Sequence, residues 1–209
     1  MKKPIVEFIG TFFLVLTVGC AAALGMADKM APLAIGSALM VMIFAGGHVS
    51  GAHYNPAVSL AVMLRGKLPS KELLGYLIAQ LLGGIVAAIV VKSIFNGGSS
   101  AASGGDVDLV PALTAEFLFT FALCYVVLNV ATAKGTQGNS FYGLAIGFTV
   151  MTGAFAVGKI SGGVFNPAVG VGLILMGAAQ AKAILMYFVA QFAAAFVASL
   201  VFQQTNGKD

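Results

Sequence analysis

Two stretches of the chain, "SGAHYNPAVSLAVMLRG" (residues 50–66) and "SGGVFNPAVGVGLILMG" (residues 161–177), carry the same Asn-Pro-Ala-Val core within a very apolar sequence. Asparagine is a preferred N-cap, and proline is favoured at the first helical position because an N–H there would lack an intrahelical partner anyway. Each Asn-Pro therefore predicts the start of a helix. The apolar runs that follow, 55–64 and 166–175, are too short to cross a bilayer, which takes roughly 20 residues. We predict two half-helices.

The rest of the composition predicts a membrane protein. Of the 209 residues, 59% are hydrophobic and 9% are charged, which is too little polar surface for a soluble domain. The opening "MKK" resembles a signal peptide, but no cleavage site follows, so the first apolar run is interpreted as a retained helix. We predict an all-α membrane protein of one domain, residues 1–209. Its six spanning helices are expected at about 5–24, 33–47, 72–91, 112–132, 141–157 and 182–203.

The basic residues predict the orientation. With both termini in the cytoplasm, seven basic residues lie inside and four outside, which agrees with the positive-inside rule. We expect an integral protein of the plasma (inner) membrane. The first half-helix then re-enters from the cytoplasm and the second from outside. The net charge of +4 is scattered between the spans, which argues against a nucleic-acid partner. The inside set is Lys2, Lys3, Arg65, Lys67, Lys71, Lys134 and Lys208, and the outside set is Lys29, Lys92, Lys159 and Lys182.

An internal repeat joins the two motifs. Aligning 44–66 with 155–177 gives 11 identities in 23 positions, including both Asn-Pro-Ala-Val cores. Each half carries three predicted spans, an odd number, so the two copies must have opposite topology in the membrane. We expect inverted repeats at about 1–94 and 110–209, joined by an extracellular loop at about 95–109. In such repeats, broken helices at equivalent positions indicate the binding or conduction site.

The two motifs predict a polar track near the membrane midplane. Half-helices that enter from opposite faces can meet at their N-termini, which are positive dipole ends, and can present the amide donors of Asn55 and Asn166. Non-helical backbone is tolerated at that depth only where it is buried or lines a watery cavity. We expect such backbone at 46–54 and 158–165. Its carbonyls are predicted to form an acceptor ladder: Gly51, Ala52, His53, Ser161, Gly162 and Gly163.

With "HVSGAHYNPAV", the paired motifs Asn55-Pro56-Ala57 and Asn166-Pro167-Ala168, and six spans, the whole chain resembles the aquaporin, or major intrinsic protein, family. The resemblance implies a homotetramer with one pore per subunit and passive conduction of water or small uncharged solutes. It also implies proton exclusion, partly by the positive field at the paired motifs. Water, small neutral solutes and the lipid bilayer are then the partners.

The outer filter departs from the family. Members usually carry arginine after the second motif, where this chain has Val169, and counting from the motifs gives Ile35, Ala154 and Gly163 as the other filter positions. Strict water channels place an aromatic and a histidine at the first two positions. The glycerol branch follows the second motif with arginine and aspartate, unlike Val169-Gly170. We therefore expect an outer constriction that is wide and apolar.

Two intramembrane carboxylates, Glu7 and Glu116, lie at matching places in the repeat. Such residues by default suggest ion or proton handling. Their placement fits a structural role better, in which each accepts hydrogen bonds from the backbone of a half-helix loop. Gln80 and Gln191 are expected to hydrogen-bond between helices.

Four other residues each have a functional and a plain interpretation. Lys159 either supplies charge to the outer filter or is solvated, and His48 either gates the pore with pH or is simply hydrogen-bonded. Cys20 and Cys124 are interpreted as packing residues, because two cysteines so far apart in the sequence make neither a disulfide framework nor a metal site. No cofactor or metal is expected.

Three functional classes fit the pattern to different degrees. A passive channel fits the uncharged midplane and needs no coupling ion. A secondary transporter also uses inverted repeats and broken helices, but typically has ionisable groups at its centre. A structural membrane tetramer with little conduction is the third. An enzyme is not expected, because the sequence shows no nucleophile with a base, metal cluster or phosphate loop.

Overall fold

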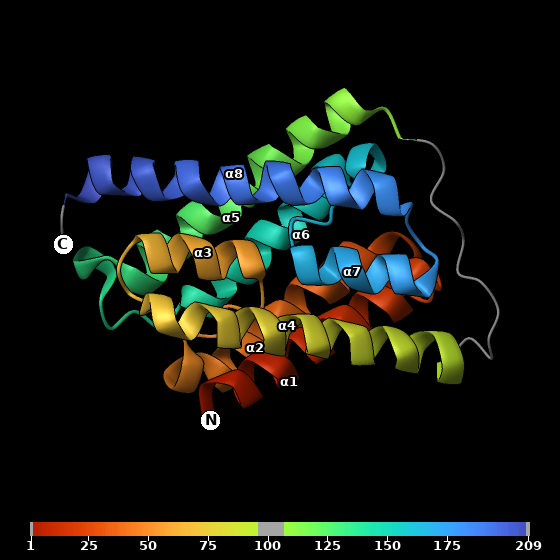
Figure 1. Ribbon diagram of the computed structural model, residues 1–209, viewed down its shortest axis with the longest axis horizontal. Helices are drawn as coiled ribbons and strands as arrows, with labels where there is room; N and C mark the ends of the chain where they lie inside the picture. Colours follow the sequence, from red (N-terminus) through yellow and green to blue (C-terminus); the bar gives the residue numbers. More distant parts are fainter. Residues whose placement is uncertain (1, 96–106, 208–209) are drawn as a thin grey trace.

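The computed structural model describes residues 2–95 and 107–207, and within them every regular element is helical (Figure 1). In this described part, six helices are long and apolar enough to cross a membrane. The predicted loop at 95–109 falls mostly outside it, as does Lys208. The long helices are α1 (Lys2–Val18), α2 (Ala31–Ser50), α4 (Ser70–Val90), α5 (Leu109–Thr132), α6 (Tyr142–Ser161) and α8 (Ala181–Asn206), and the short ones are α3 (Pro56–Leu64) and α7 (Pro167–Met176). Single turns of π-helix continue α1 (Gly19–Ala23) and α4 (Val91–Phe95), and 3₁₀ turns lie at Asp28–Met30 and Lys134–Thr136.

The helices α2 and α6 are longer than predicted. We expected non-helical backbone from residues 46 and 158, but the helices continue to Ser50 and Ser161, so those loop boundaries were wrong. Each helix ends where a glycine adopts the left-handed conformation, at φ 87° for Gly51 and φ 88° for Gly162. Glycine is the usual residue at such a C-cap because it has no Cβ to clash. Of the two predicted loop segments, only residues 51–55 and 162–166 are non-helical.

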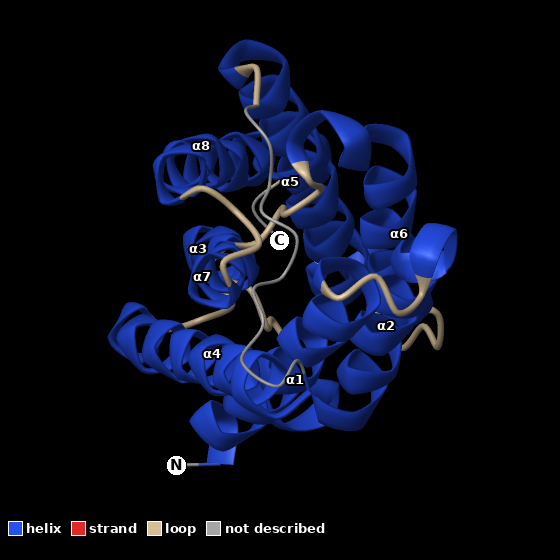
Figure 2. Ribbon diagram, turned by 90° about the vertical axis from the view of Figure 1, so that its right-hand side faces the viewer, coloured by secondary structure: helices blue, strands red, loops and turns tan. Residues whose placement is uncertain are grey.

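The two half-helices lie end to end in the middle of the molecule. Figure 1 shows α3 and α7 in line, and in the end-on view of Figure 2 they overlap at the left, between α8 and α4. The start of α1 and the end of α8 lie toward the same end of the molecule, which we call the terminal side. The loop residues next to the half-helices, Tyr54, Asn55, Phe165 and Asn166, are buried within the molecule.

Glycines let the long helices approach closely. Where α2 crosses α6, a Cβ on Gly36 would lie 2.7 Å from the carbonyl oxygen of Gly147, and one on Gly147 would lie 2.5 Å from that of Gly36. These two glycines are counterparts in the alignment of the repeats. A Cβ on Gly83 of α4 would lie 2.5 Å from the Phe8 carbonyl oxygen of α1. Small residues at such crossings are typical of membrane helix packing.

The outer ends of the half-helices are held by side chains from the opposite repeat. Lys92 Nζ donates to the Leu175 carbonyl near the end of α7 at 3.2 Å, and Gln203 Nε2 donates to the Leu64 carbonyl at the end of α3 at 3.4 Å. The two donors are counterparts in the repeat alignment, and so are the two acceptors. Arg65, which follows α3, stacks over the Phe202 ring of α8. Each half-helix therefore has a cation at its C-terminal end, where the helix dipole is negative.

The glycine contacts predict unequal effects of alanine on the same helix. Gly83→Ala should destabilise the fold by about 1–3 kcal/mol, because the added methyl group meets rigid backbone. Gly75→Ala is the matched control on α4, where the nearest atom is Pro4 Cγ at 3.9 Å, and it should be neutral or stabilise by up to about 1 kcal/mol. Thermal unfolding in detergent measures both. Equal unfolding temperatures would contradict the packing argument.

Candidate functional site

The paired Asn-Pro motifs begin the two half-helices. Asn55 Oδ1 accepts from the Ala57 N–H and Asn166 Oδ1 accepts from the Ala168 N–H, both at 2.9 Å. Both asparagines are extended N-caps, with φ −154°, and a proline follows each as the first helical residue. The side-chain oxygens thus satisfy N–H groups that the first helical turn leaves without partners.

The side-chain amides of the same asparagines join the two loops across the centre. Asn55 Nδ2 donates to the Phe165 carbonyl and Asn166 Nδ2 donates to the Tyr54 carbonyl, each at 2.9 Å. These reciprocal bonds fix the N-termini of α3 and α7 against each other. Because an amide has two N–H groups, each asparagine keeps one more donor. Sequence reasoning predicted the donors but missed the bonds between the loops.

Tyr54 and Phe165, whose carbonyls accept these bonds, adopt the left-handed conformation with φ 50° and 48°. This conformation is unfavourable for bulky side chains and is found where the surrounding structure enforces it. The Tyr54 ring lies directly over Gly10, and its hydroxyl donates to the Met42 carbonyl at 2.9 Å. The strain therefore aims each carbonyl at the asparagine of the other half.

Glu7 holds the first loop from α1. The buried carboxylate accepts from Ser50 Oγ at 2.7 Å, from the N–H groups of His53 and Tyr54 at 2.9 and 2.7 Å, and from Gln80 Nε2 at 2.8 Å. Both carboxylate oxygens are used. The loop N–H groups, which have no helical partners, are thereby satisfied inside an apolar bundle.

Glu116 does the same for the second loop from α5. Its carboxylate accepts from Ser161 Oγ at 2.7 Å, from the N–H groups of Val164 and Phe165 at 2.9 and 2.7 Å, and from Gln191 Nε2 at 2.8 Å. Each of these distances equals the corresponding distance around Glu7. The two carboxylates thus act as acceptors for loop donors, a positioning role.

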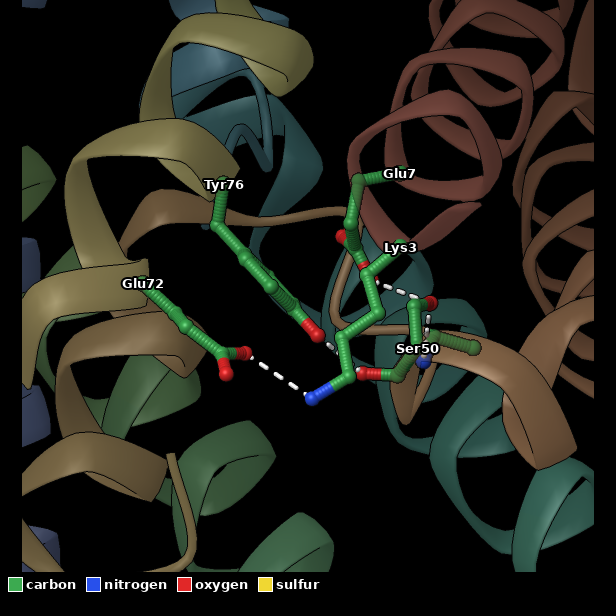
Figure 3. A network of polar contacts seen from close by, with 6 residues as sticks. Lys3, Glu7, Ser50, Glu72 and Tyr76 are labelled. Carbon is green, nitrogen blue, oxygen red and sulfur yellow. Dashed lines mark hydrogen bonds and ion pairs between the residues drawn. The ribbon is translucent and has the colours of Figure 1, made fainter. Parts of the chain in front are cut away.

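Two tyrosine hydroxyls bind the carbonyls at the ends of α2 and α6. Figure 3 shows Tyr76 of α4 pointing toward Ser50, and the Tyr76 hydroxyl donates to the Ser50 carbonyl at 2.6 Å. The Tyr187 hydroxyl donates to the Ser161 carbonyl at 3.0 Å in the other repeat. Ser161 was one of the predicted pore carbonyls, and its oxygen already has this partner. Lys3 and Glu72 form a partly exposed ion pair at 2.9 Å nearer the surface.

A cavity of about 200 Å³ lies at the junction of the half-helices. Both motif asparagines line it, and so do the four predicted filter residues Ile35, Ala154, Gly163 and Val169. Gly163 lies against Ala154, because a Cβ on Gly163 would be 3.3 Å from Ala154 Cα. The lining, which belongs entirely to the described part of the chain, includes no Asp, Glu, Lys or Arg. The cavity is a mostly apolar space with a few polar groups at its middle.

Further cavities adjoin the central one on both sides. On the terminal side, a cavity of about 280 Å³ shares His53 and Val127 with it, and a cavity of about 480 Å³ that includes His48 adjoins this one at Gly51 and Lys67. On the opposite side, a cavity of about 560 Å³ that includes Lys159 shares residues such as Val164 with the central cavity. His48 and Lys159 therefore lie in the mouths of this row of cavities.

The loop residues differ in their access to these cavities. Ala52, His53, Gly162 and Gly163 line the central cavity, whereas Gly51 lines the terminal-side cavities and Ser161 the opposite-side cavity. Sequence reasoning missed the walls that α1 and α5 contribute, such as Leu14, Leu123 and Val127. These leucines and valines belong to no motif, so no sequence signal separates them from ordinary packing residues.

The fold and this centre define a helical membrane protein with two half-helices joined at a polar midpoint. The family described as major intrinsic protein matches residues 1–154 and 141–209, so the chain belongs to the major intrinsic protein family.

Individual relatives extend along most or all of the chain. Aquaporin NIP1-1 of Zea mays is 36% identical over 188 residues, which cover 84% of this chain and 65% of that protein. The chain thus spans somewhat less than two thirds of that plant relative. Glycerol uptake facilitator protein-like 6 of Lactiplantibacillus plantarum is 34% identical over 218 residues, which cover 100% of both proteins. The X-ray structure of the aquaglyceroporin from Plasmodium falciparum superposes with a TM-score of 0.76 at 26% identity, covering 97% of this chain and 93% of that one.

The carboxylate contacts predict that charge, and not only shape, holds the loops. Glu7→Gln and Glu116→Gln should each destabilise the protein by at least about 3 kcal/mol, because an amide turns donor hydrogens toward groups that already donate. Glu72→Gln is the control at the exposed ion pair with Lys3 and should cost less than about 1 kcal/mol. Thermal unfolding in detergent compares them. If the buried variants unfold with the control, the carboxylates do not hold the loops.

Proposed function

We propose that the protein is a passive transmembrane channel for water and other small neutral solutes. The observation that carries this proposal is the row of cavities, whose central member is lined by both motif asparagines and by no charged side chain within the described residues. A neutral solute that enters this space meets amide donors and loop carbonyls at its middle and apolar walls elsewhere. The names of the relatives, an aquaporin and a glycerol uptake facilitator, point the same way.

The outer constriction is proposed at Ile35, Ala154, Gly163 and Val169. All four residues line the central cavity, and none of them has a charged or aromatic side chain. A guanidinium at Val169 would add bulk and five donors. Without it, the passage is wider and offers a permeating molecule few replacements for its lost hydration. Solutes larger than water should therefore pass more readily than through an arginine-bearing filter.

Cations are excluded by the electrostatics of the half-helices. Their N-termini meet at the asparagines, so two positive dipole ends face the middle of the passage. Lys92 and Arg65 lie at the opposite, negative ends, where they offset the negative partial charge. The field at the centre is therefore positive. A secondary transporter would need an ionisable coupling site in this region, whereas Glu7 and Glu116 are occupied by loop donors.

The setting of the channel follows from the same proposal. The terminal side faces the cytoplasm and the opposite side faces outward, in the plasma (inner) membrane. The single domain consists of inverted repeats at about 1–94 and 110–209. The family resemblance supports a homotetramer with one pore in each subunit. A tetramer that only packs in the membrane would show little conduction.

Conduction is tested by stopped-flow light scattering on proteoliposomes of the full chain. We expect osmotic shrinkage with a low activation energy and no requirement for an added ion. The relative fluxes of water, glycerol, urea, ammonia and hydrogen peroxide, measured in the same vesicles, identify the solutes. Vesicles that shrink no faster than protein-free ones would reject the channel and favour the structural tetramer, and flux that needs an ion gradient would favour a transporter.

The proposed filter predicts a change of selectivity at one position. Val169→Arg should lower the flux of glycerol and urea more than that of water, because it narrows the passage and adds donors that water can use. Val169→Leu is the control that adds bulk without donors, and it should lower the flux of all solutes, water included. An unchanged glycerol-to-water flux ratio in Val169→Arg would show that Val169 does not form the constriction.

A further inference from the structure

A chain of buried hydrogen bonds runs from Glu7 to the wall of the passage in the first half only. Gln80 Nε2 lies 2.8 Å from Glu7 Oε2 and 2.8 Å from Ser59 Oγ, and Ser59 Oγ lies 3.1 Å from His53 Nδ1. In the second half, Gln191 is kept, but the positions that match His53 and Ser59 are Val164 and Gly170. The chain is thus a feature of the terminal side alone.

The direction of each bond in this chain follows from its donors. A carboxylate has acceptor sites only, so Gln80 must turn its NH₂ group toward Glu7. Its second N–H then donates to Ser59 Oγ. This orientation leaves Gln80 Oε1 buried without a hydrogen-bond partner among the described residues. The amide is therefore fixed by its two donor bonds, and flipping it would break both.

The hydroxyl of Ser59 can satisfy this arrangement in one way. Ser59 is fully buried, and in the described structure its side chain contacts only Gln80 and His53 through hydrogen bonds. If His53 carried its hydrogen on Nδ1, Ser59 would accept two bonds and its own hydrogen would be buried without an acceptor, which is costly. If Ser59 donates to an unprotonated Nδ1, every hydrogen in the chain has a partner.

We propose that Ser59, to which Gln80 offers only a donor, is a positioning residue that holds His53 as the neutral tautomer with its hydrogen on Nε2. The Nε2 edge lies beside Gly51, where an added Cβ would be 3.1 Å from it, and Gly51 lines the terminal-side cavities. His53 itself lines both the central cavity and the adjoining cavity of about 280 Å³. The junction of these two cavities therefore carries one fixed N–H donor.

This inference rests on the proposed channel and defines its solutes more narrowly. The imidazole donor follows the Asn55 and Asn166 donors along the passage, so the lining favours solutes with an accepting oxygen, such as water and small alcohols. The same tautomer opposes proton transfer. A hydrogen-bearing Nε2 accepts no proton, and Nδ1 already accepts the hydrogen bond from Ser59. The imidazole therefore cannot relay a proton between water molecules in the passage.

The tautomer is measured by ¹⁵N solid-state NMR of the full chain in lipid vesicles at neutral pH. The chain has two histidines, and the exposed His48 is the internal reference, assigned with His48→Gln. We expect His53 with its hydrogen on Nε2 in at least about tenfold excess, the ratio set by one unpaired buried hydroxyl. Ser59→Ala should lose this excess, and Ser59→Thr should retain it. A wild-type His53 that carries its hydrogen on Nδ1, or on both nitrogens, overturns the proposal.

Two further measurements keep the test decisive. If Ser59→Ala does not fold, the wild-type spectrum decides independently. Gln80→Met removes a donor to Ser59 without adding an acceptor, so it should keep the excess, because Nδ1 is still the acceptor for the Ser59 hydrogen. Loss of the excess in Gln80→Met would overturn the proposal. In the same vesicles, the proton-to-water permeability ratio should rise in Ser59→Ala and not in Ser59→Thr. Equal ratios would overturn the proton barrier. A wild type that conducts no solute but shows the expected tautomer would reject the channel and leave the role of Ser59 intact.

Discussion

The loops at 51–55 and 162–166 impose the constraint on which the rest of the structure depends: their backbone is non-helical at the middle of an apolar bundle. In such surroundings each unpaired N–H or carbonyl is costly, because no bulk water can replace the missing partner. Glu7 and Glu116 supply acceptors for the loop N–H groups, and Asn166 and Asn55 supply donors for the carbonyls of Tyr54 and Phe165. Loop residues such as Ala52, His53, Gly162 and Gly163 line the central cavity.

This solution requires the halves to be built against each other. Each loop is supported by a carboxylate from its own repeat, yet its strained carbonyl is bound by the asparagine of the other repeat. At their far ends, α3 and α7 are again held by the opposite repeat, through Gln203 and Lys92. A helix as short as either of these has little stability alone. It is stable here because both of its ends are anchored.

The repeat is close to symmetric where the loops are supported and asymmetric where the passage is lined. Around Glu7 and Glu116 the same donors recur at equal distances, since both loops have the same backbone to satisfy. Along the passage, His53 and Ser59 have Val164 and Gly170 as their counterparts. Support of the loops constrains both halves equally, whereas the chemistry presented to a solute is set separately on each side.

The sequence by itself determined the membrane class, the half-helices and the pairing of the motifs, because each depends on local rules: span length, the Asn-Pro helix start and the repeat alignment. It misplaced the loop boundaries, since Gly51 and Gly162 end the helices only through a left-handed C-cap that the glycine-rich segments before them obscure. Only the tertiary structure decided that each asparagine binds the opposite loop, that Val127 and His53 adjoin two cavities, and that Ser59 lies between Gln80 and His53. These contacts join residues on different helices, and their geometry depends on how the two repeats pack, which no local pattern specifies.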